Sequence, residues 1–408
     1  MTTYSGLWKI LSCKNMSAAD LRKYTGIAPN TMTKIRKNEK VSLDVLDRIC
    51  DVLECDYSDI VSYTEDIQAA NIATFNINNR RYLGNKYKLI PFIKNVVAKY
   101  CQSVSSMADI FSGTGVVASV FKGKQIITND LMYSNYICNY AWFSGKNFNQ
   151  NKLLKIISYF NSVDVNEDNY MTENFADTYF SRKDCAKIGY IREHIEIMYL
   201  CREINKRERA LLIMSLIYAM DTIANTCGHY DAYIQDADFH KHLVLSFPNA
   251  SMVNNPLNCC YNEDANELVN RISTDLVYID PPYNSRQYCD AYHLLENVAL
   301  WKKPDVFGVA RKMDRTSIKS RYCTKSAETA FIELIGNINS RYILFSYNNM
   351  ANKGNARSNA KISDDVIIET LRKKGKVQVF EERYKAFSTG KSNIQDHSER
   401  LFLCTCKK

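Results

Sequence analysis

The sequence predicts an α/β fold with an open sheet, preceded by a small all-α domain. Two short apolar runs, residues 107–110 and 276–279, are typical of buried strands, and each ends abruptly in turn residues. The first 66 residues instead carry apolar side chains at helical spacing, with helix start and stop signals. With 408 residues and 46% hydrophobic content, the chain is long enough to bury both cores.

The N-terminal domain, residues 1–66, predicts a helix-turn-helix. Ser17 is placed as the N-cap of its second helix, and Gly26 breaks the helical pattern. Residues 27–37 and 42–53 then predict two further helices. The order of helices resembles the small Cro-like repressor domains, in which one helix enters the major groove of DNA.

This resemblance implies a set of DNA-binding side chains on the helix over residues 27–37. They are Asn30, Thr31, Thr33, Lys34 and Arg36. The domain as a whole does not carry an excess of basic residues, so its overall charge does not argue for DNA. A helical bundle that binds protein or packs on the rest of the chain is the alternative.

A glycine-rich turn follows the first predicted strand. Residues 107–110 lead into Gly113 and Gly115, and glycine lets a backbone approach a ligand closely. The next apolar run, residues 125–128, ends just before Asp130. An acidic residue at this distance after the glycines is placed to accept both hydroxyls of a ribose.

The strand predicted over residues 276–279 ends in Asp280-Pro281-Pro282-Tyr283. Prolines stop a strand, and ligands of open α/β sheets bind at the carboxyl ends of the strands. The Asp280 carboxylate and the Pro281 carbonyl can each accept one N–H of a planar aromatic amine. The Tyr283 ring can cover the face of the heterocycle. The motif therefore favours an aromatic amine as substrate.

Together these motifs resemble the S-adenosylmethionine-dependent DNA adenine-N6 methyltransferases, in the order of Dam-like enzymes. The family carries Asp-Pro-Pro-Tyr as its catalytic motif. Its cofactor loop is Asp/Glu-x-Phe-x-Gly-x-Gly, which this chain matches at Asp109, Phe111, Gly113 and Gly115. The resemblance covers about residues 79 to 408. It implies a Rossmann-like methyltransferase sheet and a target adenine that is flipped out of the duplex.

The resemblance also implies a division of the chain. Residues 67–79 would be a linker, and residues 80–139 and 261–408 would form the catalytic domain. The stretch between them, residues 140–260, would be a mostly helical insertion that recognises the target sequence.

Further cofactor contacts follow from the resemblance. Residues 81–86, here called the closing segment, would cover the methionine end of the cofactor, with Lys86 pairing with its carboxylate. The acidic loop over residues 262–266 would lie near its adenine, with Asp264 as acceptor. The expected cofactor-binding residues are Tyr82, Gly84, Lys86, Asp109, Phe111, Gly113, Gly115, Asp130 and Asp264. Residues 225–231 and 284–296 continue the resemblance, but their chemistry assigns them no firm role.

Charge supports a polyanionic partner. The formal net charge is +9, and most of the excess falls in residues 67–149 and 301–408. Such a surface attracts phosphate backbones. The densest cluster lies over residues 302–325, where Lys312, Arg315 and Arg321 are expected to contact DNA; a solvated loop is the alternative.

Composition bounds the remaining classes. No apolar run approaches the roughly 20 residues of a membrane span, and the N-terminus does not open as a signal peptide. The 14 cysteines lack a paired framework, so reduced thiols in a cytoplasm, and no metal site, are expected.

The expected partner is double-stranded DNA, together with a cognate restriction endonuclease. Other functions stay open at this point. The chain could instead be a transcriptional regulator with a catalytically silent domain, or a cytosine-N4 or RNA adenine methyltransferase. The N-terminal domain would serve self-regulation or anchoring.

Overall fold

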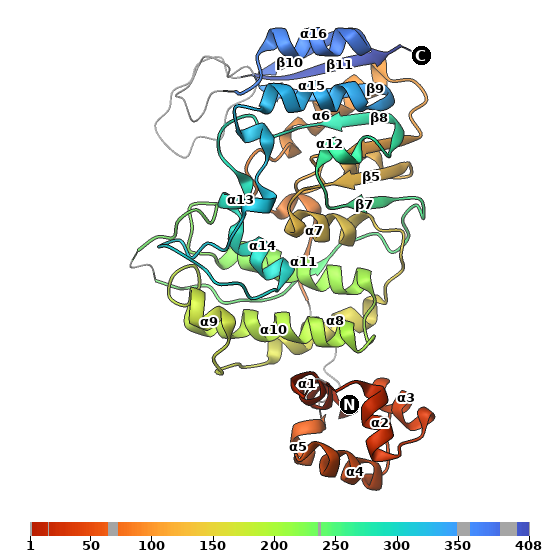
Figure 1. Cartoon of the computed structure of the whole chain (residues 1–408), viewed down its shortest axis with the longest axis vertical. Helices are drawn as coiled ribbons and strands as arrows, with labels where there is room; N and C mark the ends of the chain where they lie inside the picture. Colours follow the sequence, from red (N-terminus) through yellow and green to blue (C-terminus); the bar gives the residue numbers. More distant parts are fainter. Residues whose placement is uncertain are drawn as a thin grey trace.

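A computed structural model describes residues 2–14, 16–63, 72–235, 238–348, 360–383 and 398–407. Figure 1 shows three parts along the long axis: the helical N-terminal domain, a middle layer of helices and, at the opposite end, the sheet. Within the described ranges, no helix is long and apolar enough to cross a membrane.

The N-terminal domain forms the predicted succession of helices. It contains α1 (Ser5–Cys13), α2 (Ala18–Thr25), α3 (Pro29–Arg36), α4 (Leu43–Leu53) and α5 (Tyr57–Ile60), closed by the antiparallel pair β1 (Thr2–Thr3) and β2 (Ser62–Tyr63). Ser17 caps α2 as expected, because its hydroxyl accepts the Asp20 N–H at 3.1 Å. Gly26 ends that helix with a φ of +65°, a conformation that favours glycine.

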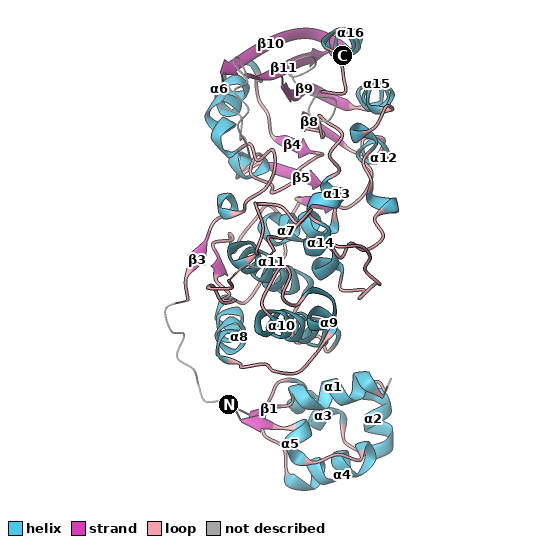
Figure 2. Cartoon of the chain, turned by 90° about the vertical axis from the view of Figure 1, so that its left-hand side faces the viewer, coloured by secondary structure: helices cyan, strands magenta, loops and turns pink. Residues whose placement is uncertain are grey.

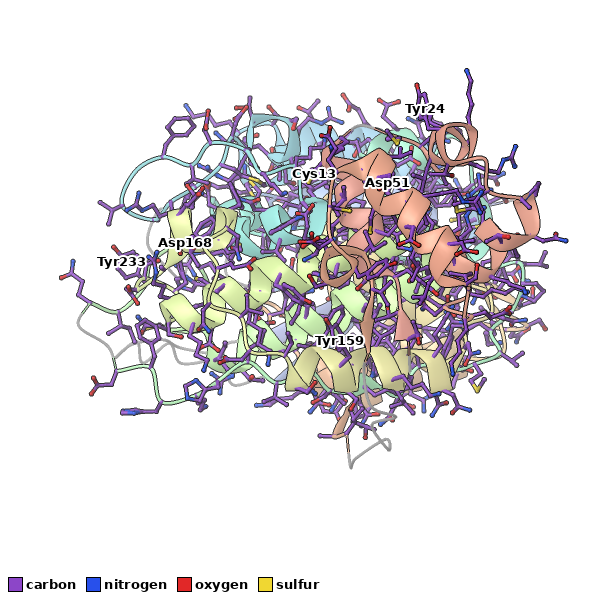
Figure 3. All side chains as sticks on the ribbon, turned by 90° about the horizontal axis from the view of Figure 1, so that it is seen from below. Cys13, Tyr24, Asp51, Tyr159, Asp168 and Tyr233 are labelled. Atoms are coloured by element: carbon purple, nitrogen blue, oxygen red, sulfur yellow. The ribbon has the colours of Figure 1, made fainter. Side chains whose placement is uncertain are left out.

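The core of the N-terminal domain extends onto the insertion. Ile197 of α10 (Arg182–Leu200) is buried within the cluster formed by α1 to α5, and Cys201 packs against it. Figure 3 views the molecule from below, with Cys13, Tyr24 and Asp51 labelled on the N-terminal domain in front of the helices of the insertion. The domain is therefore held against α10 by apolar contact.

The sheet has seven strands in the order β10-β11-β9-β8-β4-β5-β7. Their bounds are β4 (Ser106–Asp109), β5 (Gln125–Asn129), β7 (Cys259–Tyr261), β8 (Ser273–Ile279), β9 (Asn339–Asn348), β10 (Gly375–Arg383) and β11 (Ser398–Cys406). The five neighbouring strands β9, β8, β4, β5 and β7 pair in parallel, whereas β11 is antiparallel to both β9 and β10. The predicted α/β class is confirmed, while β7 had no clear signal in the sequence.

Both faces of the sheet are covered, which explains why its central strands are continuously apolar. In β8, Leu276 and Tyr278 face one core, and Val277 and Ile279 face the other. The first core contains α6 (Ile90–Tyr100), and the second contains α12 (Ala265–Leu268), α15 (Ala327–Asn337) and α16 (Asp364–Lys374). Figure 2 shows the sheet between these two layers.

The middle layer is helical. It comprises α7 (Tyr133–Phe143), α8 (Gln150–Ser162), α9 (Tyr170–Phe175), α10, α11 (Lys206–Ile223), α13 (Tyr288–Ala291) and α14 (His293–Leu300). Short 3₁₀ turns occur at Ile77–Asn79, Tyr87–Leu89, Ala118–Phe121, Thr316–Ile318 and Arg321–Cys323. One segment differs from the predicted linker: β3 (Thr74–Phe75) pairs in parallel with β6 (Phe247–Pro248), so the chain joins the folded body before residue 79.

Candidate functional site

The carboxyl ends of β4, β5 and β8 open into one pocket of about 930 Å³, mouth included. This is where ligands of open α/β sheets bind. The predicted site residues that line it are Tyr82, Gly84, Lys86, Asp109, Phe111, Gly113, Asp130, Asp264, Asp280 and Pro282. Gly115, Pro281 and Tyr283 are not among the lining residues.

The glycine loop, residues 109–115, is tied to the end of β5. The Gly113 N–H donates to Asp130 Oδ2 at 2.8 Å, and the Met132 N–H donates to Asp130 Oδ1 at 2.9 Å. Both bonds lower the pKa of Asp130, but burial is the larger effect and raises it overall. Each carboxylate oxygen keeps a second lone pair with which it can accept a ligand hydroxyl.

Asn139 of α7 secures the same loop and was not anticipated from the sequence. Its Nδ2 donates to Ser112 Oγ at 2.9 Å and to the Gly113 carbonyl at 3.1 Å. Gly115 has a φ of +78°, and a Cβ there would lie 2.1 Å from Asn139 Oδ1. The loop therefore needs glycine at residue 115 both for its backbone conformation and for space.

Asp109 is the most unusual carboxylate of the pocket. It is 1% exposed, and within the described part of the chain its Oδ1 has no hydrogen-bond partner. Burial and the nearby charges of Asp280 and Asp130 raise its pKa well above the usual range. A buried carboxylate oxygen without a donor is costly unless a ligand supplies one. The site therefore suits a ligand with a cationic or N–H group at this point.

Two tyrosines hold the closing segment. The Tyr82 ring stacks on Tyr292 with ring centroids 4.5 Å apart and on Tyr288 at 5.4 Å. The Tyr292 hydroxyl accepts the Leu83 N–H at 2.7 Å, and the Tyr288 hydroxyl donates to the Leu83 carbonyl at 3.2 Å. Gly84 has a φ of +74° and lies against the Tyr288 hydroxyl. These contacts give two residues of the 284–296 stretch a role that their chemistry alone did not assign.

Lys86 lines the pocket, where its ammonium lies among carboxylates of the chain, and its pairing with a cofactor carboxylate stays a prediction. Its Nζ is 2.9 Å from Asp280 Oδ1 and 3.8 Å from Glu399 Oε1, and it donates to the Tyr283 hydroxyl. A buried ammonium needs anionic partners, and these two carboxylates supply them. Glu399 was missed because no motif surrounds it.

Asp280 takes its electrostatic character from this cluster. Burial raises the pKa of Asp280 to about 6, Lys86 opposes the rise, and Glu399 adds to it. The carboxyl group therefore changes charge close to neutral pH, which is typical of groups that handle protons in active sites.

Tyr283 is held in place by Tyr347 of β9. Its ring meets the Tyr347 ring edge-on, with centroids 5.6 Å apart, and its carbonyl accepts the Lys361 N–H at 2.8 Å. The Tyr347 hydroxyl accepts the backbone N–H groups of Lys361 and Ile362 at 3.1 and 3.0 Å. The Tyr283 ring is only half-buried, so part of its surface is free to meet a planar ligand.

An apolar corner closes the other end of the pocket. The Phe111 ring packs edge-on against Tyr322, with centroids 5.1 Å apart. Asp264 lies beside them and caps α12 by accepting the Asn266 N–H at 2.8 Å. Two rings with a carboxylate at the rim suit a heterocycle that carries an amino group.

The predicted DNA-binding residues fall into two groups. On α3, Asn30, Thr33, Lys34 and Arg36 are exposed, and Thr31 is half-buried. The three basic residues of the 302–325 stretch are instead paired with carboxylates of the chain. The pairs are Lys312 with Asp231 at 2.8 Å, Arg315 with Asp290 at 2.7 Å and Arg321 with Glu333 at 3.0 Å. These pairs reduce the charge that the second group offers to phosphate, so its DNA contact stays a prediction.

Comparison with known proteins agrees with this geometry. The model of the D12 class N6 adenine-specific DNA methyltransferases matches residues 82–350, and that of the Cro/C1-type helix-turn-helix DNA-binding domain matches residues 6–66. Modification methylase StsI of Streptococcus sanguinis is 37% identical over 66% of this chain and 44% of its own length. Type II methyltransferase M.FokI of Planomicrobium okeanokoites is 33% identical, over 65% and 44%. Type II methyltransferase M.NlaIII of Neisseria lactamica is 29% identical, over 78% and 95%. The chain thus spans less than half the length of the first two relatives and nearly all of the third.

Proposed function

Because the chain belongs to the D12 class of N6 adenine-specific DNA methyltransferases, we propose that it methylates adenine N6 in a specific DNA sequence, with S-adenosylmethionine as methyl donor. The placement of Asp280 in the pocket, beside the glycine loop and the closing segment, carries the proposal. In this proposal the seven-stranded sheet is a Rossmann-like methyltransferase sheet.

The reaction needs an activated amine, because the lone pair of the adenine N6 is delocalised into the ring. In the proposed mechanism Asp280 and the Pro281 carbonyl accept the two N–H groups and draw the nitrogen toward a tetrahedral geometry. Tyr283 stacks on the base. Much of the rate gain then comes from orientation and from acceptors that are already in place.

The amine must lose a proton once the new N–C bond has formed. We assign this proton to Asp280, because burial raises its pKa to about 6 and its carboxylate lines the pocket. A general base of this pKa is matched to neutral pH.

The pocket fits the proposed cofactor on independent grounds. Asp109 offers an unpartnered buried oxygen among the described residues. The Asp130 carboxylate lines the pocket with lone pairs that can accept hydroxyls, and Phe111 with Tyr322 forms a corner for a heterocycle. S-adenosylmethionine would supply an electrophilic methyl group on a sulfonium. Lys86 lies 2.9 Å from Asp280 Oδ1, and its pairing with the carboxylate of the cofactor is part of the proposal.

The target base lies inside a duplex, so we propose that it is flipped into the pocket at a cost of a few kcal/mol. The helical insertion, residues 140–260, is proposed to read the surrounding sequence. We further propose that the protein acts in the cytoplasm and that a cognate restriction endonuclease is its partner; the relatives named as type II methyltransferases support the second proposal.

Sequencing genomic DNA from cells that express the protein, with modified bases called, tests the proposal. We expect N6-methyladenine within one short sequence motif, absent from cells that express Asp280→Ala. Modified cytosine instead, or no modified base, would reject adenine specificity or the activity itself.

The N-terminal domain is proposed to bind DNA through α3, for self-regulation or for anchoring the enzyme. Its exposed polar residues and its family match support this role. We expect Lys34→Ala to weaken binding to the upstream DNA of its own gene several-fold, because one phosphate or base contact is lost.

Fluorescence anisotropy at low salt measures this binding, and Lys23→Ala, an exposed lysine on α2, is the control. The methylation rate of Lys34→Ala should stay normal. Equal binding by wild type and Lys34→Ala would contradict the role of α3.

A further inference from the structure

Glu399 lies beside Lys86, a lining residue of the pocket, and comes from a strand that no sequence motif marks. It is the second residue of β11, and it pairs in register with Asn348 at the end of β9. Because β11 runs antiparallel to β9, its beginning lies at the edge of the sheet where β8 and β9 end. Asp280 follows directly after β8. The topology thus brings Glu399 beside the catalytic motif.

The surroundings of Glu399 leave it dependent on Lys86. Its side chain is 7% exposed, its Oε1 lies 3.8 Å from Lys86 Nζ, and its Oε2 has no hydrogen-bond partner among the described residues. The next residue, Arg400, bonds instead to Asp364 at 2.6 and 2.8 Å. Successive residues of a strand point to opposite faces, so Arg400 cannot serve Glu399.

The cluster therefore holds two carboxylates and one ammonium in a buried place. A structural ion pair needs only one carboxylate. Burying a second carboxylate costs desolvation free energy, which its few contacts within the described residues do not recover. If Lys86 merely neutralised Asp280, an apolar residue at position 399 would fit better. The second acid is better explained by what it does to the other two groups.

We propose, on the basis of the methyl-transfer function above, that Glu399 is a positioning residue: it shares Lys86 with Asp280 and thereby sets the charge and orientation with which Asp280 meets the adenine amine. When the amine donates to Asp280, Lys86 keeps an anionic partner in Glu399. Lys86 then remains buried and paired while Asp280 is released for the substrate.

This arrangement predicts how the methylation rate falls toward acid pH, which is the acid limb of the pH profile. Methyl transfer needs Asp280 ionised, so the rate falls as the pH drops through its pKa of about 6. The negative charge of Glu399 contributes to that raised pKa. Removing this charge should lower the pKa of Asp280, and the acid limb should move to lower pH.

Other ionisable groups near Asp280 do not obscure the effect. They are Lys86 from the closing segment, Asp109 from β4, Tyr278 from β8, and Tyr283 and Tyr288 from the segment that follows β8. The pKa values of the three tyrosines are raised, so they stay neutral in the assay range. The pKa of Asp109 is also raised, but by burial and by the charges of Asp280 and Asp130, and Glu399 is not among the causes.

The test is the pH profile of single-turnover methylation by the full-length protein, from about pH 5 to pH 8, on a duplex carrying its target motif. For Glu399→Gln we expect an acid limb about one pH unit lower than that of wild type, as removal of a nearby like charge produces. The control is Glu369→Gln, an exposed residue of α16 whose substitution should not move the profile.

Glu399→Asp completes the set, because it keeps the charge on a shorter side chain. We expect its rate to fall several-fold with the acid limb in place, and it also serves if the Gln variant does not fold. An unmoved limb in Glu399→Gln, or a shifted limb in Glu399→Asp, would overturn the positioning role. The proposed function fails separately, if the wild type transfers no methyl group at any pH.

Discussion

Asp280→Ala is expected to reduce methyl transfer at least about a hundredfold while leaving cofactor affinity largely intact. The variant removes the acceptor for one N–H of the amine and the group that takes up its proton. Lys86 keeps Glu399 as a partner, 3.8 Å away, so the pocket should not lose its shape. Transfer of a labelled methyl group measures the rate, and calorimetry with S-adenosylmethionine measures cofactor binding.

Two further variants separate catalysis from stability. Asp280→Asn keeps the shape and one acceptor oxygen but loses the charge, so we expect a rate between those of wild type and Asp280→Ala. Asp275 lies earlier on β8, where it accepts hydrogen bonds from Ser105 and Ser106 and its pKa is lowered to about 2. Asp275→Ala should lower the melting temperature and leave the rate near normal. Near-normal transfer by Asp280→Ala would refute the role of its carboxylate.

Much of the architecture could be predicted, because its signals are local. The end of β8 is marked by the prolines after Asp280, the glycine loop by Gly113 and Gly115, and the cap of α2 by Ser17. Each depends on the conformation of a few neighbouring residues. The short strand β7 lacked such a signal, since three residues are too few to show a period.

The parts of the site that were missed depend on contacts between distant segments. Glu399 enters through the register of β11, and Asn139 enters through the packing of α7. No spacing in the sequence encodes these approaches. The ion pairing of Lys86 within the chain could not be predicted for a related reason, since Glu399, 3.8 Å from it, is 313 positions away along the chain.

Gly115→Ala is expected to destabilise the glycine loop and to abolish cofactor binding in the micromolar range. A φ of +78° costs an alanine about 1 kcal/mol. The new Cβ would also lie 2.1 Å from Asn139 Oδ1 and 2.8 Å from the Phe143 ring. Asn139 cannot turn aside cheaply, because it is 1% exposed and its Nδ2 is bonded to Ser112 and Gly113.

Gly123→Ala is the matched control, because Gly123 has a similar φ of +86° but nothing within 4 Å of the added Cβ. Both variants bear the backbone strain, and only Gly115→Ala bears the clash, whose cost in a packed site is typically about 1–3 kcal/mol more. In chemical denaturation, the free energy of unfolding should therefore fall from wild type to Gly123→Ala and further to Gly115→Ala. Calorimetry should detect heat of cofactor binding for wild type and Gly123→Ala but not for Gly115→Ala. If Gly115→Ala bound the cofactor as strongly as Gly123→Ala, the glycine loop would have to move away from Asn139 without loss of function. The hydrogen bonds from Asn139 would then not fix the shape of the loop.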